Sequence, residues 1–507
     1  MNLNSDRDAA RFLDRATFGV RRAELQELRN IGVEAWLKVQ RELPPSYQFP
    51  LLKHKRDQVR NGNFWHYQRV GAWYDTVLWG KDQLRQRMAF ALSQLVVVSI
   101  KDDGLSGSGK DGGKWGQRLH GVVNYYDMLI ENALGNYRDI LNHVSRSPIM
   151  GTFLTHMGNR SFAASGSHPD QNYARELMQL FSIGLNELEL NGTVRLDSEG
   201  IPIENYSVED VENVAKIMTG WQKNNDMLKP MKLNESVHDQ GEKRVLGHYF
   251  PPGVGAEEEL NQLLDILIAH PSTAPYISKF FISKLVTSNP KPDYVERVAR
   301  VFRDTQGDLF EMAKAILLDP NAYHENPLHL AKVREPILYF TGYLRILDVR
   351  TSTSLGFTYT DGNIKSSINQ VPMAAPSVFN FFESDYSPQG PVADNELIAP
   401  ELDGYDWTLF LGSENQVHRQ LWSFDDKNFG SRSDRFYISI ADYVDIAADS
   451  VSLIDLITQR VLNGKISDAL YQALVEITDS YNGNNAREIA RQALYMSLTS
   501  PEYRVQE

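Results

Sequence analysis

The amino-acid sequence predicts a mainly α-helical protein: a large, bundle-like body of many helices, with long irregular loops and very little β-structure. Three observations predict this class. Apolar residues recur at helical spacing in most segments, the connections between those segments are mostly short, and strand-like patterns are confined to two stretches. No repeat of fixed period occurs, which argues against a solenoid.

The predicted helices share this apolar periodicity and are bounded by capping residues, glycine or proline. In chain order they occupy 7–40, 82–100, 124–134, 137–147, 170–183, 207–220, 257–270, 274–287, 293–303, 308–318, 327–347, 450–462, 466–478 and 485–498. Leu84, Met88 and Leu95, for example, fall on one stripe of a helix. Asn136 is placed to cap the fourth helix, and Pro148 to end it. Strands are expected only at 192–195 and 436–438.

Three regions lack periodicity: 101–118, which is rich in glycine, 221–256, and 350–435, which is rich in aromatic residues, proline and glycine. Loops this long are usually functional or mobile. We therefore expect a main helical domain at 1–350, a loop-rich section at 351–435 packed on it, and a C-terminal helical cluster at 436–507.

Composition excludes several classes of function. The chain has 507 residues, is 42% hydrophobic and carries a net charge of −13, which argues against a general nucleic-acid binder. It has no cysteine, which excludes disulfides, thiolate catalysis and cysteine-ligated metals. No segment has the ~18 apolar residues of a membrane span. The N-terminus carries charges where a signal peptide needs an apolar core, so the chain as written is expected to be cytoplasmic.

Several motifs are distributed along the chain: Arg11-Phe12-Leu13-Asp14-Arg15-Ala16-Thr17-Phe18-Gly19, the run from Asn172 to Gly184, Asp210-Val211 with Thr219-Gly220-Trp221, the run from His238 to Lys243, the run from His270 to Pro275, Pro376-Ser377-Val378-Phe379, and Ser500-Pro501-Glu502-Tyr503. Together they resemble one bacterial family, DUF1800, a domain of unknown function. The resemblance spans nearly the whole chain. It implies no defined chemistry. It does imply an exported or periplasmic location and an alkaline-phosphatase-like or sulfatase-like partner, although this chain lacks an evident leader.

The first candidate site is the predicted helix 170–183. Asn172, Arg175, Glu176 and Gln179 fall on one face of it. An arginine beside a glutamate can hold the carboxylate ionised, or position it as a base or metal ligand. The alternative is a solvated helix face with a surface ion pair.

The second candidate is the run from His238 to Lys243 in an irregular segment. Here His238 and Asp239 can act as metal ligands or as an acid–base pair, and Lys243 can hold an anionic substrate. Asn172 is a further candidate for cofactor binding. The alternative is an Asx-type turn with a surface lysine.

A metal site would add His168 and His143 to His238, Asp239 and Glu176, with His156 nearby in sequence. Two or three histidines with a carboxylate suit Zn²⁺, Mn²⁺ or non-haem iron. Haem with a histidine ligand is a smaller possibility. Each histidine taken alone is more often a structural group.

Two further segments bear on binding. Gly104–Lys110 matches G-x-x-x-x-G-K, but Asp111 and two glycines follow, so we expect a surface loop or a lid rather than a nucleotide site. Residues 371–386 are apolar and aromatic, which suits either the wall of an elongated groove or a loop tucked against the core.

Two hypotheses for function follow. The first is an enzyme, a hydrolase or an oxidoreductase with or without a metal, in which Glu176, Arg175, His238 and Asp239 line one concave pocket. Its substrate would be a small molecule, a peptide or a carbohydrate. The second is a non-catalytic binding or scaffold protein for a protein, peptide or carbohydrate, with these residues dispersed or paired within the packed helices.

Overall fold

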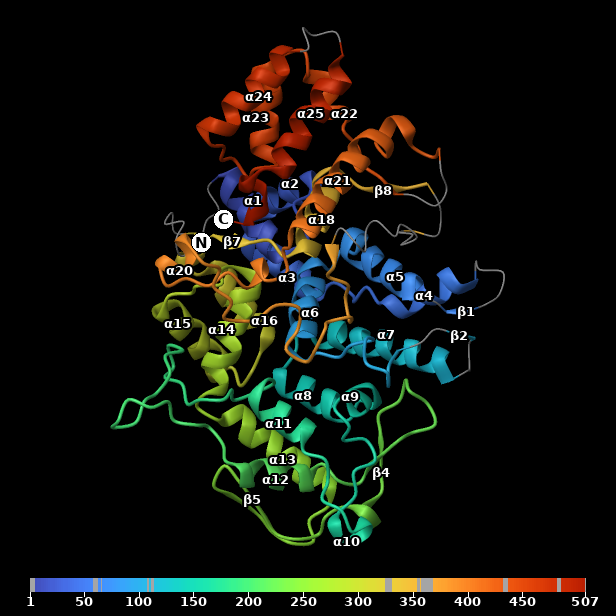
Figure 1. Ribbon diagram of the computed structural model, residues 1–507, viewed down its shortest axis with the longest axis vertical. Coiled ribbons are helices and arrows are strands. Elements are labelled where there is room, and N and C mark those ends of the chain that lie inside the picture. Colours follow the sequence, from blue (N-terminus) through green and yellow to red (C-terminus); the bar gives the residue numbers. More distant parts are fainter. Residues whose placement is uncertain are drawn as a thin grey trace.

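The computed structural model describes residues 5–57, 63–64, 66–106, 109–110, 114–323, 331–352, 356, 368–431, 436–480 and 485–506 (Figure 1). Within this part the chain forms 24 α-helices and is 58% helical. The strands described are short and occur as antiparallel pairs. The predicted mainly α-helical class is therefore confirmed.

The helices follow one another along the whole chain. They are α1 (Asp6–Ala16), α2 (Arg22–Ile31), α3 (Val33–Glu42), α4 (Gln48–Asp57), α5 (His66–Trp79), α6 (Gln83–Leu95), α7 (Lys114–Asn132), α8 (Tyr137–Ser145), α9 (Pro148–Phe153), α10 (Phe162–Ser165), α11 (Asn172–Gln179), α12 (Val208–Ile217), α13 (Ala256–Ala269), α14 (Thr273–Leu285), α15 (Pro292–Asp304), α16 (Leu309–Leu318), α18 (Pro336–Ile346), α20 (Pro391–Asp394), α21 (Trp407–Ser423), α22 (Ala441–Ile446), α23 (Ser450–Arg460), α24 (Asp468–Ser480), α25 (Ala486–Thr499) and α26 (Pro501–Arg504).

Five strand pairs join segments of this helical body. They are β1 (Asn63–Phe64) with β2 (Gly109–Lys110), β3 (Trp221–Gln222) with β4 (Lys232–Leu233), β5 (Lys243–Val245) with β6 (His248–Phe250), β7 (Lys332–Val333) with β10 (Val505–Gln506), and β8 (Arg350–Thr351) with β9 (Phe436–Tyr437).

Local sequence signals explain many of the helix boundaries. The Asn136 side chain accepts a hydrogen bond from the Arg138 backbone and caps α8 as predicted. Ser207 and Asp210 form a capping box at the start of α12. Pro148 was predicted to end a helix, and α8 does end before it. The same proline also begins α9 behind Ser147, because proline at the first helical position loses no hydrogen bond.

Other boundaries differ from prediction for identifiable reasons. The helical stretch 7–40 is broken after α1 and again at Gly32, whose φ is +80°. The glycine-rich segment 101–118 runs into α7, which begins at Lys114. In the stretch 327–347, residues 327–330 lie outside the described residues. Lys332 and Val333 pair with β10, and the helix begins only at Pro336.

Two predictions about irregular and strand segments were wrong. The section 350–435 contains α21, whose buried face mixes Leu409 and Val417 with Gln416 and Gln420, so that no apolar stripe marks it. Within the expected strand at 192–195, Val194 forms only an isolated bridge. A second isolated bridge, at Leu196, lies just beyond it. The expected strand at 436–438 is present as β9, at Phe436 and Tyr437. Helices α4 and α5 were not predicted.

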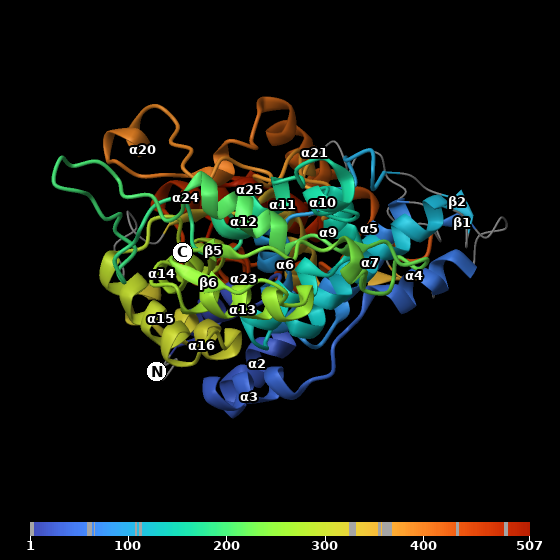
Figure 2. The ribbon, with the colours of Figure 1, turned by 90° about the horizontal axis from the view of Figure 1, so that it is seen from below.

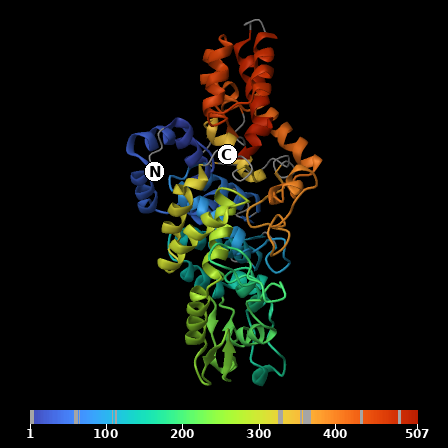
Figure 3. The same ribbon diagram turned by 90° about the vertical axis from the view of Figure 1, so that its left-hand side faces the viewer.

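Helix α6 lies at the centre of the molecule (Figure 2). It contacts α1, α3, α5, α7 and α14 and is buried on every side. Most of the buried apolar residues form one continuous cluster that extends from Ala9 to Tyr503, and Leu52, Ala72, Leu119 and Val123 form a second, small cluster. Helices α23, α24 and α25 form one end of the elongated molecule, and the β5–β6 hairpin lies near the other (Figure 3). The division into three sections stays a prediction. No described helix is long and apolar enough to cross a bilayer.

Candidate functional site

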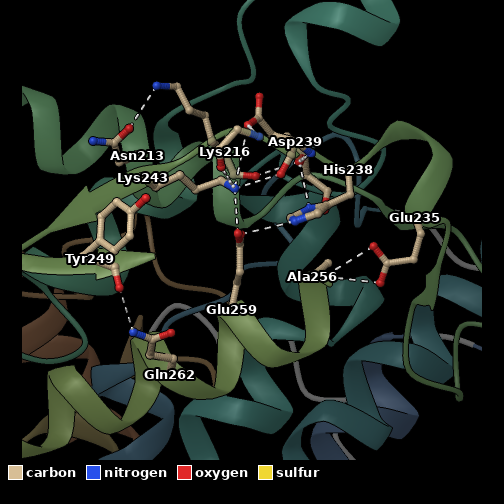
Figure 4. A network of polar contacts seen from close by, with 12 residues as sticks. Asn213, Lys216, Glu235, His238, Asp239, Lys243, Tyr249, Ala256, Glu259 and Gln262 are labelled. Atoms are coloured by element: carbon tan, nitrogen blue, oxygen red, sulfur yellow. Dashed lines mark hydrogen bonds and ion pairs between the residues drawn. The ribbon is translucent and has the colours of Figure 1, made fainter. Parts of the chain in front are cut away.

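The run from His238 to Lys243 forms a buried ionic cluster with Glu259 (Figure 4). Glu259 lies in the first turn of α13, and its Oε1 is 2.7 Å from Lys243 Nζ. Its Oε2 is 3.2 Å from His238 Nε2, an ion-pair distance without the alignment of a good hydrogen bond. The side chains of all three residues are 0% exposed.

The remaining polar atoms of this cluster are also largely occupied. His238 Nδ1 lies 3.0 Å from the backbone oxygen of Thr219. Lys243 Nζ donates to the backbone oxygens of Asp239 (2.8 Å) and Gly241 (3.0 Å) in addition to Glu259. An ammonium has three protons, so Lys243 has none left for a ligand. These contacts hold the loop against α13, and the side chains of His238 and Lys243 are not accessible to solvent.

Asp239 differs from its neighbours because its side chain keeps some exposure. Its Oδ1 accepts a hydrogen bond from the Gly241 backbone at 3.0 Å, the contact of an Asx turn, and lies 3.7 Å from Lys243 Nζ. The predicted turn is therefore present. The lysine expected at the surface is instead buried, because Glu259 supplies a counter-charge that no local sequence pattern reveals.

Helix α11 carries the second set of predicted residues. Glu176 is buried while Asn172 and Arg175 are exposed. Burial raises the pKa of Glu176, and the charge of Arg175 opposes this rise. Glu176 Oε2 has no hydrogen-bond partner. Among the residues described, no hydrogen bond or ion pair joins Glu176 or Arg175 to the His238 cluster, so the two predicted halves of the site are not brought into contact.

The histidines do not converge on one point. His143 and His168 are exposed. His156 is buried, lies 3.0 Å from the Ser145 backbone oxygen through Nε2 and stacks on Tyr173, and burial lowers its pKa to about 4. In the described parts of the chain, no group of three or more His, Asp or Glu residues is arranged to hold a metal ion. The candidate ligands do not fit a shared metal, and a bound metal or haem stays a prediction.

A separate cleft of about 480 Å³ opens beside the central helix. It is formed by α14, the end of α6, Leu180 and two stretches of the loop-rich section, 376–385 and 398–403. Phe280, Phe379 and Phe381 line it, so the predicted groove wall is present. Ala374 and Ala375, just before that wall, are buried against the core, as the alternative interpretation expected. Of the loop Gly104–Lys110, no residue lines this cleft, and Gly107 and Ser108 lie outside the described residues.

A network of polar side chains extends from Gln94 and Asn380, which line this cleft, to buried residues behind them. Gln94 and Gln370 both donate to Glu335 Oε2, at 3.0 and 2.5 Å. Asn380 donates to Gln94 Oε1 at 2.8 Å. Glu335 is 0% exposed, and its second oxygen has no hydrogen-bond partner. An unsatisfied buried carboxylate oxygen is costly, so it marks a place where polar groups are held for a purpose other than packing.

Lys284 is the cation that faces this cleft. It lies in the last turn of α14, and no described group forms a hydrogen bond or ion pair with its Nζ. Burial lowers the pKa of Lys284; the charge of Glu335 opposes this change, and that of Lys332 reinforces it. Lys332 is itself paired with Glu401, which also lines the cleft. Lys284 thus lines an aromatic cleft without a close ion pair to any described group, and the carboxylates of Glu335 and Glu401 act on its charge from a distance.

Glu176 is linked to this cleft rather than to His238. Tyr276 and Leu180 line the cleft, and Leu180 directly follows α11. The charge of Glu176 contributes to raising the pKa of the Tyr276 hydroxyl, after burial itself. The Tyr206 hydroxyl donates to Gln179 Oε1 at 3.0 Å on the same side of α11. One of the two predicted sites therefore borders the cleft, although none of its four face residues lines it.

The sequence analysis did not predict four polar residues that line the cleft, nor Glu335 behind them; the four are Gln94, Lys284, Asn380 and Glu401. The local signal that the sequence did give was the apolar segment 371–386. The polar residues lie far apart in the chain and carry no common spacing.

A family model described as a protein of unknown function, DUF1800, matches residues 11–505, nearly the whole chain. No curated protein and no solved structure matches the sequence.

Proposed function

The chain belongs to the DUF1800 family, and from that premise we propose that it is an enzyme whose site is the cleft above Lys284. One observation carries the proposal: Lys284 lines an aromatic cleft, forms no close ion pair with a described group, and has its pKa lowered by burial. Perturbed ionisable groups in clefts are typical of catalytic sites.

The chemistry that this cleft serves best is hydrolysis of a small molecule. Lowering the pKa of Lys284 favours its neutral amine, and a neutral amine can accept a proton from a water molecule and return it to a leaving group. Phe280, Phe379 and Phe381 suit an apolar or aromatic body of the substrate. Asn380, whose buried Oδ1 has no partner, is placed to hold a polar part of it. The oxidoreductase alternative has no comparable observation in its favour.

Glu176 supports this proposal from the border of the cleft. Because its pKa is raised, Glu176 is a second group able to exchange protons. It is close enough to Tyr276, which lines the cleft, for its charge to act on the tyrosine hydroxyl. His238 and Asp239 do not support it in the same way, because their contacts are with Glu259, Thr219 and Gly241. We therefore place the reaction at Lys284 and give the His238 cluster a role in holding the fold.

The competing function is non-catalytic binding. Phe379 is 64% exposed at the rim, and an exposed aromatic ring can stack on a sugar ring or a peptide side chain. On this alternative Lys284 would hold an anionic group of the ligand without turning it over. Both functions place the ligand in the same cleft, so a test of turnover separates them.

The test compares two lysines of helix α14. Lys284→Met removes the amine that faces the cleft, and Lys279→Met removes an exposed lysine of the same helix that does not line it. Hydrolysis of a panel of p-nitrophenyl esters of short and aromatic acids would be measured for both variants and the wild type. We expect loss of at least about 100-fold in Lys284→Met and no change in Lys279→Met.

Activity retained in Lys284→Met would contradict the proposal. A wild type that hydrolyses none of the esters, yet binds an aromatic carboxylate such as benzoate in a manner that depends on Lys284, would favour non-catalytic binding. Three further proposals do not depend on this cleft. An alkaline-phosphatase-like or sulfatase-like partner would be found by co-purification, and a bound metal ion by elemental analysis. Cell fractionation would establish the compartment.

A further inference from the structure

A second hollow, of about 1000 Å³, lies between α2, the end of α18, and helices α22 and α23. It shares no lining residue with the cleft above Lys284. Figure 3 shows the N-terminal helices beside the C-terminal helical end, where this hollow forms. Six arginines line it: Arg21, Arg22, Arg29, Arg345, Arg350 and Arg460.

The acidic residues of the hollow are already bound. Asp6 pairs with Arg29 at 3.0 Å, and Asp348 pairs with Arg350 at 2.6 Å. Asp442 is shared by two arginines, at 3.1 Å from Arg22 and 2.7 Å from Arg460. Six cations therefore face three carboxylates within the lining, and a local excess of positive charge remains.

The charge of Arg345 is also paired with a carboxylate. Its Nη2 donates to both oxygens of Glu24, at 2.7 and 2.6 Å. Its other nitrogens donate to backbone oxygens, including that of Gly19. Arg345 is thus fully engaged, and its positive charge also repels that of Arg21, an effect that the charge of Glu24 opposes.

Among the described residues that line the hollow, Arg21 is the arginine for which no hydrogen bond or ion pair is found. It precedes α2, and its Nε and Nη2 are buried without a hydrogen-bond acceptor. Burial and the charge of Arg345 lower its pKa to about 10, against the opposing charges of Glu24 and Asp348. A guanidinium offers five N–H donors, and leaving them unsatisfied is costly. An anion in the hollow would remove this cost.

A second side chain indicates the same ligand. Tyr443 is 2% exposed, lines the hollow, and finds no acceptor for its hydroxyl proton among the described residues. It belongs to α22, whereas Arg21 directly precedes α2. The Arg460 guanidinium lies 5.8 Å from the centre of the tyrosine ring and cannot accept that proton.

We propose that this hollow binds a small tetrahedral oxyanion, a phosphate or sulfate group, either free or carried by a small molecule. Arginines that approach from several elements match an ion whose oxygens point in several directions, and a planar carboxylate would engage fewer of them. The volume leaves room for an organic body beyond the charged group. The binding site is independent of the proposed reaction, because no residue is shared.

The experiment uses the full chain and sodium phosphate, with sodium chloride at equal ionic strength as reference. The melting temperature and the binding isotherm would be measured for the wild type, for Arg21→Gln, and for Arg300→Gln, an exposed arginine of α15 that lines no part of the hollow. Parallel titrations use sulfate and succinate. A ligand that binds only the folded state raises the melting temperature, and the stabilisation grows with the logarithm of ligand concentration over Kd once that ratio is large.

We expect phosphate and sulfate to raise the melting temperature of the wild type and of Arg300→Gln, and to bind Arg21→Gln at least about tenfold more weakly. In chloride, Arg21→Gln should melt at or above the wild-type temperature, because it removes a cation without a counter-ion. Equal phosphate binding by Arg21→Gln and the wild type would overturn the proposal, and so would no binding at all. Succinate binding in preference to phosphate would overturn the tetrahedral class.

Discussion

The buried cluster of His238, Lys243 and Glu259 shows at the residue scale how one motif can be read in two ways. From the sequence alone, a histidine, an aspartate and a lysine within six positions are typical of an active-site loop. In the fold, Glu259 comes from α13 and neutralises the lysine. The charged residues of the motif could be identified from the sequence, but the partner of Lys243 could not. Glu259 reaches the lysine only because α13 packs against this loop, and no sequence pattern in α13 indicates that contact.

This cluster gives a direct prediction for stability. Lys243→Met leaves the Glu259 carboxylate buried beside His238 alone, and removing one partner of a buried pair costs about 3–5 kcal/mol. The double variant Lys243→Met/Glu259→Leu should regain most of that loss, because both buried charges disappear. Unfolding in urea would measure both. Lys229→Met, at a lysine whose side chain is 68% exposed, serves as the control and should change little.

A double variant as unstable as Lys243→Met would contradict this account. It would mean that the loop needs its charges for more than mutual neutralisation.

His156 predicts how stability depends on pH. Its pKa is lowered to about 4 by burial, against an ordinary value of 6.5. As the pH falls below about 6.5, His156 becomes protonated in the unfolded chain but stays neutral in the folded protein. The free energy of unfolding therefore decreases until the pH reaches about 4. The difference corresponds to about 3 kcal/mol.

His156→Gln tests this prediction, because glutamine can still donate to the Ser145 oxygen but does not titrate. Urea midpoints at pH 7 and pH 4.5 would be compared for both proteins. We expect the wild type to lose more stability than the variant over this interval. Equal losses would show that His156 is protonated in the folded state without cost.

At the scale of elements, the sequence predicted helices where they are amphipathic and missed them where they are not. Helix α15 has a clean buried face and was predicted within a residue or so at each end. Helices α5 and α21 were missed, because α5 is buried on most sides and the buried face of α21 is half polar. Periodicity reports the contrast between two faces, and a helix without that contrast gives little signal.

The packing of α18 against the turn after α1 requires a glycine. A Cβ added at Gly19, whose φ is +132°, would lie 2.6 Å from Gly342 Cα. Gly19→Ala should therefore cost about 3 kcal/mol, from the backbone conformation and the collision together. Gly166→Ala shares the positive φ (+74°) but meets nothing within 4 Å, and should cost only about 1 kcal/mol.

Thermal or urea unfolding of these two variants separates the cost of the collision from that of the backbone. Similar losses in both would mean that α18 can move aside at Gly19.

At the scale of the whole molecule, the base of the Lys284 cleft is assembled from parts that are remote in sequence. Gln94 comes from α6, Lys284 from α14, Glu335 from the start of α18 and Asn380 from the loop-rich section. No spacing rule joins such residues, which is why the fold class was predictable and this site was not. Only the apolar segment that walls the cleft had a local signal.

Strand β10 predicts a global effect of a local deletion. Gln506 donates to the Leu285 backbone oxygen at 2.8 Å, next to Lys284, and β10 pairs with β7 beside Lys332. Deleting residues 505–507 should lower the melting temperature by several degrees in one shifted transition, because the main apolar cluster contains residues from both ends of the chain. Calorimetry would measure it. An early, separate transition would show instead that this end of the molecule unfolds independently.

The same contact has a consequence for biosynthesis. The backbone next to Lys284 meets Gln506, so the ribosome must add more than two hundred further residues before the base of the cleft can close. Until then the aromatic wall has no finished counterpart, and the nascent chain carries an unfinished pocket. A chain released early, for instance at a premature stop codon, would contain every cleft-lining side chain and still lack the segment that holds them in place.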